Sequence, residues 1–136
     1  ARLLPTVRPH ILGNLFANLC AAAPPRGRDT FEITRFCLSR RQSSKARLET
    51  RNELVSALAW HALGSKIRTY TGVAEMGWLQ QILAFGWDCR PLGVPARFNR
   101  TMIGALAIDI TAETPALLAE NGIWRQPHPA PMPQAA

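Results

Sequence analysis

The sequence is poor in cysteine and lacks long apolar runs. Its only three cysteines, Cys20, Cys37 and Cys89, are too few and too scattered for a disulfide framework. A reducing compartment is therefore the simpler setting, and we expect a cytoplasmic protein. No apolar run approaches the roughly 18 residues that a membrane-spanning helix needs, which excludes an obvious signal or transmembrane segment.

The motifs of several enzyme classes are also missing. The sequence has no G-x-S-x-G elbow, no phosphate-binding loop, no G-x-G-x-x-G fingerprint, and no Cys/His spacing that would hold zinc. Covalent nucleophiles, nucleotide hydrolysis and metal chemistry are all disfavoured by these absences, and we expect no metal site. A reaction that needs one proton acceptor and good positioning of its substrates remains open.

Acidic residues are outnumbered. The chain of 136 residues has 16 Lys and Arg against 9 Asp and Glu, a net charge of +7, together with 47% hydrophobic residues. This composition predicts one compact domain attracted to an acidic partner: nucleic acid, an anionic membrane surface or an acidic protein. The residues between 40 and 51 include one acid, Glu49, and five bases, which we call the basic run: Arg40, Arg41, Lys45, Arg47 and Arg51.

A basic nucleic-acid-binding domain is one alternative for this charge. However, no aromatic residues are interleaved with the arginines of the basic run, and the chain shows neither a helix-turn-helix nor an RNP pattern. Nucleic acid is therefore the less favoured partner.

Hydrophobic periodicity predicts an α/β fold in which helices cover a sheet. We expect helices over 9–19, from a Ser43 or Ser44 cap to Gly64, over 75–85 and over 115–120, with strands over 31–38, 67–73 and 101–110. Residues 1–124 would form the domain, and the proline-rich residues 125–136 a disordered tail. Because the chain starts at Ala1, inside a strand-like segment, we expect part of a longer protein.

Glu32 is the most informative single residue. It lies in a predicted strand between Phe31 and Ile33, where a carboxylate would be partly desolvated and could act as a general base. The alternative is structural: Glu32 and Arg35 form an internal ion pair, or Glu32 faces solvent at a sheet edge.

Three blocks of sequence resemble the acyl-homoserine-lactone synthases of the LuxI type. They are Arg2-Leu3-Leu4-Pro5-Thr6, Glu32-Ile33-Thr34-Arg35-Phe36, and Tyr70-Thr71-Gly72-Val73 running into Met76-Gly77-Trp78-Leu79 and Gly86-Trp87. The blocks occur in the family's order between Arg2 and about Ile110. The family's N-terminal block has no counterpart before Arg2, so the resemblance indicates an N-terminally truncated fragment that would be inactive alone; a catalytically inactive synthase fragment is thus a further alternative.

The resemblance implies a GNAT-like mixed sheet, incomplete at the N-terminus, and an acyltransferase that makes quorum-sensing signals. In this family the amine of S-adenosylmethionine attacks an acyl thioester carried on acyl carrier protein, or in some members on coenzyme A. The S-adenosylmethionine carboxylate then closes the lactone and expels methylthioadenosine. S-adenosylmethionine is a substrate here, so the resemblance implies no cofactor.

The resemblance also assigns residues. Glu32 matches the proposed base, which acts directly or through water. Arg2 matches the substrate-binding arginine of the family's R-L-x-x-T block, and Arg35 matches the arginine near S-adenosylmethionine. Thr34 and Thr71 match small polar residues beside the acyl chain. Trp78 or Met76 could line an acyl pocket.

Two further expectations concern geometry and charge. Because a regular strand would put Glu32 and Thr34 on one face and Arg35 on the other, we expect a bulge or splay at 33–35. Arg40, Arg41 and Lys45 precede or begin a helix where GNAT-like folds meet the pantetheine phosphate, so we expect them either to help dock acyl carrier protein or to form a solvated face.

Overall fold

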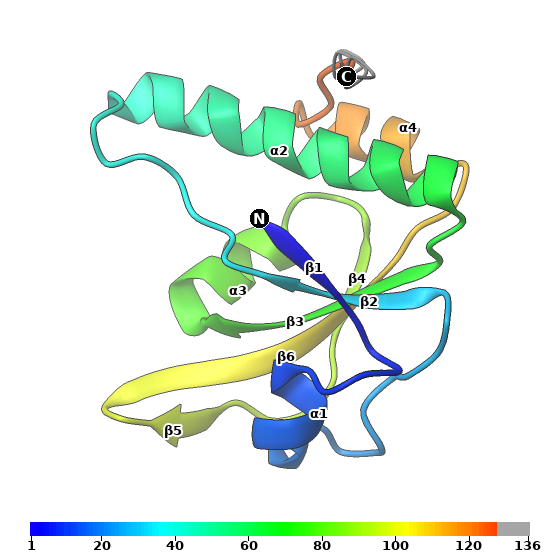
Figure 1. The fold of residues 1–136 in the computed structure, drawn as a ribbon. Helices are drawn as coiled ribbons and strands as arrows, with labels where there is room; N and C mark the ends of the chain where they lie inside the picture. The colour runs from blue at the N-terminus through cyan, green and yellow to red at the C-terminus, as the bar shows by residue number, and fades with distance from the viewer. Residues whose placement is uncertain (128–136) are drawn as a thin grey trace, which may run out of the picture.

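A mixed sheet with helices on both faces forms the domain (Figure 1). The computed structural model describes residues 1–127. The strands are β1 (Arg2–Pro5), β2 (Thr30–Thr34), β3 (Thr69–Glu75), β4 (Asp88–Pro91), β5 (Ala96–Phe98) and β6 (Thr101–Asp109). Their order is β1-β2-β3-β6-β4, with β5 also paired to β6. Only β2 and β3 run parallel within the described residues, so the α/β architecture is confirmed as a mixed sheet.

The helices divide between the two faces of the sheet. They are α1 (Ile11–Leu15), the 3-10 helix η1 (Ala17–Leu19), α2 (Ser44–Ser65), α3 (Met76–Leu83) and α4 (Thr114–Glu120). In Figure 1, α2 and α4 lie on one side of the sheet and α1 on the other. Along β6, Ile103 and Ala105 pack against α1, whereas Leu106 and Ile108 join the larger core under α2 and α3. This alternation is what a central strand covered on both faces requires.

Helix α2 forms where its apolar stripe predicts it. The Ser43 hydroxyl accepts a hydrogen bond from the Ala46 amide at 3.2 Å and caps the helix, as expected. The C-terminal end lies one residue beyond the predicted Gly64, at Ser65, and Lys66 takes the left-handed conformation with φ 58°. Within residues 1–127, no helix has the length and apolarity needed to cross a bilayer.

Several predicted boundaries were wrong. The helix expected over 9–19 is two short helices, because Phe16 leaves helical geometry with φ −128°. The strand expected over 31–38 ends at Thr34. Strands β4 and β5 were not predicted at all, since four and three residues are too short to show alternation.

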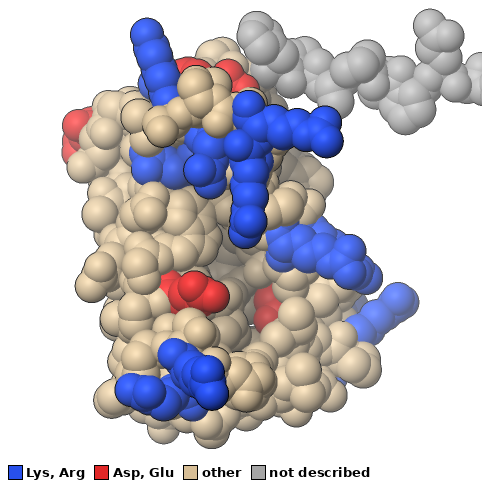
Figure 2. Space-filling view, turned by 90° about the vertical axis from the view of Figure 1, so that its left-hand side faces the viewer, with Lys and Arg blue, Asp and Glu red and all other residues tan. Residues whose placement is uncertain are grey.

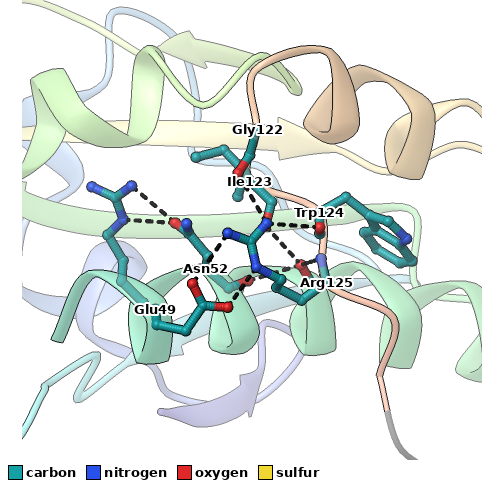
Figure 3. A network of polar contacts seen from close by, with 8 residues as sticks. Glu49, Asn52, Gly122, Ile123, Trp124 and Arg125 are labelled. Atoms are coloured by element: carbon teal, nitrogen blue, oxygen red, sulfur yellow. Dashed lines mark hydrogen bonds and ion pairs between the residues drawn. The ribbon is translucent and has the colours of Figure 1, made fainter. Parts of the chain in front are cut away.

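The segment after α4 is fastened to α2 (Figure 3). The Arg125 amide donates to the Ser56 hydroxyl at 2.9 Å, and that hydroxyl donates to the Asn52 carbonyl at 2.8 Å. The Arg125 guanidinium also pairs with Glu49. The tail predicted over 125–136 therefore begins with an attached residue, and its remainder from 128 lies outside the described residues.

Candidate active site

The sheet opens between its two parallel strands. The β2–β3 pairing covers only Thr30 with Thr69, Phe31 with Tyr70 and Glu32 with Thr71. On the other side, β2 stays in regular antiparallel register with β1 as far as Thr34. The expected bulge is therefore absent from the β1 side, and the expected splay lies on the β3 side.

Arg35 ends β2 with an uncommon backbone conformation. Its φ of 51° is in the left-handed region, which costs a residue with a side chain about 1–2 kcal/mol. The turn directs the chain away from β3 and toward the loop that leads to α2. Such strain is concentrated at functional sites, which makes this turn a marker for the site beside it.

A cavity of about 320 Å³ occupies the opening. Consecutive residues of β3 line its edge, whereas Leu106 and Ile108 of β6 and the aromatic residues that line it belong to the core under α2 and α3, so the cavity lies on that face and reaches the gap between the strands. Its mouth is formed by exposed residues such as Arg35 and Glu75, and its inner end by buried ones. The lining residues from the strands and the loop are Ile33, Thr34, Arg35, Phe36, Thr71, Gly72, Val73, Ala74, Glu75, Leu106 and Ile108.

Three of the five residues assigned from the resemblance to catalysis or substrate binding line this cavity: Thr34, Arg35 and Thr71. The Thr71 side chain is fully buried, and its hydroxyl has no hydrogen-bond partner in the described structure. A buried hydroxyl without a partner is costly, so Thr71 is an exception among the buried polar side chains beside the cavity.

Glu32 lies in β2 and is buried, as its sequence context predicted, but its hydrogen-bond partners were not foreseen. The side chain is only 1% exposed, and its two carboxylate oxygens accept hydrogen bonds from the Ile11 and Leu12 amides, each at 2.8 Å. It therefore holds the first turn of α1, and neither structural alternative applies: the described residues show no ion pair with Arg35, and Glu32 does not face solvent. Its strand neighbour Thr71 places it beside the cavity, although it does not line it.

Arg2 lies further out. It pairs with Thr34 in the β1–β2 register, and its side chain is exposed and does not contribute to the cavity wall.

Aromatic rings form one continuous wall of the cavity. Phe36 stands 4.8 Å from Trp78, Trp78 6.1 Å from Phe85, and Phe85 5.9 Å from Trp87, measured between ring centroids. All four line the cavity, together with Ile82, and Val55 and Leu58 of α2. Of the two pocket candidates from the sequence, Trp78 is in the wall and Met76 is not. The apolar stripe of α2 was not predicted to line a cavity, because hydrophobic periodicity does not distinguish a residue of the core from a residue of a cavity wall.

A second hollow adjoins the cavity. This groove shares Phe36, Glu75 and Trp78 with it and is also lined by basic residues. Figure 2 shows basic side chains gathered on one face, beside a hollow with acidic side chains at its edge. The groove-lining bases are Arg40, Arg47 and Arg51, whereas Arg41 and Lys45 are exposed outside it. Arg47 and Arg51, four residues apart on one side of α2, were not among the predicted docking residues, although their spacing shows that they share a face.

The chain has the architecture of a GNAT-like acyltransferase. Its mixed sheet contains one parallel pair, β2 and β3, which separates beside a cavity, and the helix α2 connects the two strands. No model of a known protein family matches the sequence. Solved structures, however, do match. The CoA-dependent acyl-homoserine lactone synthase MesI superposes with a TM-score of 0.76 at 30% identity over 88% of this chain and 60% of MesI.

Two other synthases agree. The CoA-dependent BjaI, solved with MTA and also with SAM and isopentyl-CoA, gives a TM-score of 0.74 at 26% identity, covering 94% of this chain and 62% of BjaI. LasI gives 0.76 at 26% identity, covering 87% of this chain and 61% of LasI. The chain thus spans about 60% of the length of these enzymes. The predicted resemblance is confirmed: the chain has the fold of the LuxI-type acyl-homoserine-lactone synthases.

Proposed function

We propose that the chain belongs to an enzyme that makes N-acyl-homoserine lactones, and that it forms the part of the active site that holds the acyl group. The cavity at the gap between β2 and β3 supports this proposal most directly. An acyl thioester would enter from the groove beside α2, and an amine would approach its carbonyl at the gap between the two strands. The MesI and BjaI matches support acyl-coenzyme A as one class of donor, since those enzymes are CoA-dependent synthases.

The acyl chain would extend along the aromatic wall toward Leu58. The cavity of about 320 Å³ is at the lower end of the ~300–1,000 Å³ of small-molecule sites, which favours the shorter acyl groups. The unpartnered Thr71 hydroxyl would donate to an oxygen on the third carbon, and Thr34 lines the same opening.

The reaction needs one proton acceptor. The amine of S-adenosylmethionine attacks the thioester carbonyl, the thiol leaves, and the amine gives up a proton; the carboxylate then closes the lactone and methylthioadenosine departs. We assign the proton to Glu32 through a water molecule, because both of its oxygens already accept amide hydrogen bonds and each keeps a further lone pair. Arg35 and Arg2 would hold S-adenosylmethionine, the first at the cavity mouth.

The donor arrives as acyl-coenzyme A or on acyl carrier protein. Both carry the thioester on a pantetheine arm, which the groove fits as an extension of the cavity. Arg40, Arg41 and Lys45 would attract the acidic surface of a carrier protein. These three residues are exposed just before and at the start of α2, which suits docking. If they only form a solvated face, they would be equally exposed, but their substitution would not affect binding of the donor.

The test is to express the complete reading frame in a bacterial host that makes no lactones and to analyse the medium by mass spectrometry. We expect an acyl-homoserine lactone from the natural sequence and none from the Glu32→Gln variant. Because the substituted amide would keep only one acceptor oxygen for two α1 amides, thermal unfolding and tryptophan fluorescence should confirm that the variant folds and binds an acyl thioether. Lactone production by a folded Glu32→Gln variant at the natural rate would refute the role of Glu32, and the absence of lactone from the natural protein would refute the function.

A further inference from the structure

A further hollow lies beside α1, which is on the opposite side of the sheet from α2 (Figure 1). We call it the α1 hollow. Its volume is about 390 Å³, and it shares no lining residue with the cavity or the groove. Its charged or titratable side chains are Arg8, His10 and Arg26, and Val7 and Pro24 are among the apolar residues of its remaining wall.

His10 is the side chain of this hollow whose hydrogen bonding is incomplete. It is 8% exposed, and its Nδ1 lies 2.9 Å from the Arg8 carbonyl oxygen. Because a carbonyl only accepts, Nδ1 carries the proton of that bond. The other ring nitrogen, Nε2, is buried and has no hydrogen-bond partner in the described structure. A buried nitrogen of this kind is uncommon in a folded protein, and it points to a ligand that supplies the missing partner.

Gly13 makes room for the His10 ring. It lies within α1, where glycine is less favourable than every other residue except proline. A Cβ at position 13 would stand 2.7 Å from Cε1 and 2.8 Å from Nε2 of His10, which is too close for any side chain. The ring therefore lies with its Cε1–Nε2 edge against Gly13, and Gly13 itself lines the hollow. This places the unpaired nitrogen at the wall of the hollow.

Two guanidinium groups add positive charge to the same wall. Arg26 donates from Nη2 to the Val7 carbonyl at 2.9 Å, which holds it at the hollow and leaves its other N–H groups for a ligand. Among residues 1–127, neither Arg8 nor Arg26 takes part in an ion pair, and no Asp or Glu lines the hollow. Two arginines beside a histidine, without a carboxylate, are donors that suit an oxyanion.

We propose that the α1 hollow binds a phosphate group through Arg8, Arg26 and Nε2 of His10. A phosphate has enough oxygens to meet two guanidinium groups and the ring nitrogen together, and Nε2 either accepts from a phosphate hydroxyl or, when protonated, donates to a phosphate oxygen. The volume is within the ~300–1,000 Å³ of small-molecule sites, so an organic group attached to the phosphate would fit beside Val7 and Pro24. The inference is independent of lactone synthesis, because the hollow is separate from the cavity and the groove.

The experiment titrates the natural protein with phenyl phosphate and with inorganic phosphate, each by isothermal titration calorimetry in a phosphate-free buffer. We expect binding of both. Tighter binding of phenyl phosphate would identify a phosphate ester as the occupant, and equal affinities would identify free phosphate. Arg26→Met and Arg8→Met should each weaken binding about tenfold or more, since each removes a hydrogen bond between charged partners.

Control variants locate the binding. Arg28→Met removes the same charge at an exposed position outside all three hollows, and Arg40→Met removes a base of the groove; both should leave the affinity unchanged. Gly13→Ala forces the His10 ring out of its position and should weaken binding without a change of charge. In proton NMR, phosphate should shift the His10 Cε1 signal of the natural protein but not that of the double variant Arg8→Met, Arg26→Met.

The replaced arginines are both exposed, so the double variant should fold, and thermal unfolding checks this. An unchanged phosphate affinity in the double variant would overturn the inference. So would the absence of binding to the natural protein at millimolar ligand, or an equal loss of affinity in Arg28→Met. None of these results would bear on the proposed function, which the lactone analysis tests separately.

Discussion

The unpaired hydroxyl of Thr71 is unfavourable for the stability of the free protein, and we propose that it contributes to ligand binding. Its hydroxyl is buried without a partner in the described structure, whereas Thr69 in the same strand donates to Asp109 at 2.9 Å. Thr71→Val removes the unpaired hydroxyl at nearly constant volume, so we expect the free energy of unfolding to rise by about 1 kcal/mol. Thr69→Val removes a paired one and should lower it by a similar amount.

The same pair of variants tests the role in specificity. Thr71→Val should weaken binding of a 3-oxo-acyl thioether relative to its unsubstituted analogue, and Thr69→Val should not. Chemical denaturation and ligand titration of both variants measure the two effects. A destabilised Thr71→Val chain would mean that the hydroxyl has a partner in solution.

Cysteine reactivity also depends on position. The pKa of the Cys89 thiol is raised to about 12, mainly because the thiol is buried. The charges of Arg90, Asp88 and Asp109 have smaller effects. At pH 8 only about one Cys89 in ten thousand is a thiolate, the form that reacts. Cys37 is exposed. We expect iodoacetamide to label Cys37 first and Cys89 only after unfolding, as peptide mass spectrometry would show; rapid labelling of Cys89 in the folded chain would contradict its burial.

At the scale of elements, α2 connects the fold to the cavity. The segment after α4 is fastened to it, and Val55 and Leu58 form part of the cavity wall. The buried Ser56 hydroxyl accepts from the Arg125 amide. Ser56→Ala leaves that amide unpaired, so we expect a loss of about 1–3 kcal/mol in the free energy of unfolding. Thermal unfolding measures it, and Ala57→Ser, on the exposed side of α2, is the control.

Leu58 should limit the length of the acyl chain. It is 6% exposed and belongs to the buried part of the cavity wall. With S-alkyl-pantetheine ligands of increasing length, affinity should rise about fourfold per methylene until the cavity is full, and then fall. Leu58→Ala should move the optimum to a chain longer by one or two carbons, whereas Leu63→Ala, on the same helix but outside the wall, should not. An unmoved optimum would place the end of the cavity elsewhere.

Sequence patterns predicted the long elements well and the site only in part. The α2 stripe and its Ser43 cap are local signals, and both are present in the structure. The amide partners of Glu32 lie 20 and 21 residues away on α1, and no periodicity could reveal them. An irregularity was expected at 33–35 within a strand that continued to 38, but the left-handed backbone of Arg35, just after β2 ends, depends on the surrounding tertiary structure.

At the scale of the whole molecule, charge is concentrated where the donor would enter. Arg40, Arg47 and Arg51 line the groove beside the cavity mouth, and Arg41 and Lys45, which lie between them in the sequence, are exposed. A field of this kind raises the rate at which an acidic partner arrives, and salt weakens it because the screening length is about 8 Å at physiological ionic strength.

Charge reversal tests whether this surface receives a carrier protein. The double variant Arg40→Glu, Arg41→Glu should raise the apparent KM for acyl carrier protein at low salt, with a smaller effect at high salt and a smaller one for acyl-coenzyme A. The double variant Arg97→Glu, Arg100→Glu changes the net charge equally, but at exposed positions on the β5–β6 hairpin outside the groove. It should leave the KM nearly unchanged if the location of the charge matters. Equal effects of the two double variants would show that only net charge attracts the donor, and an unchanged KM for Arg40→Glu, Arg41→Glu would mean that these arginines form a solvated face.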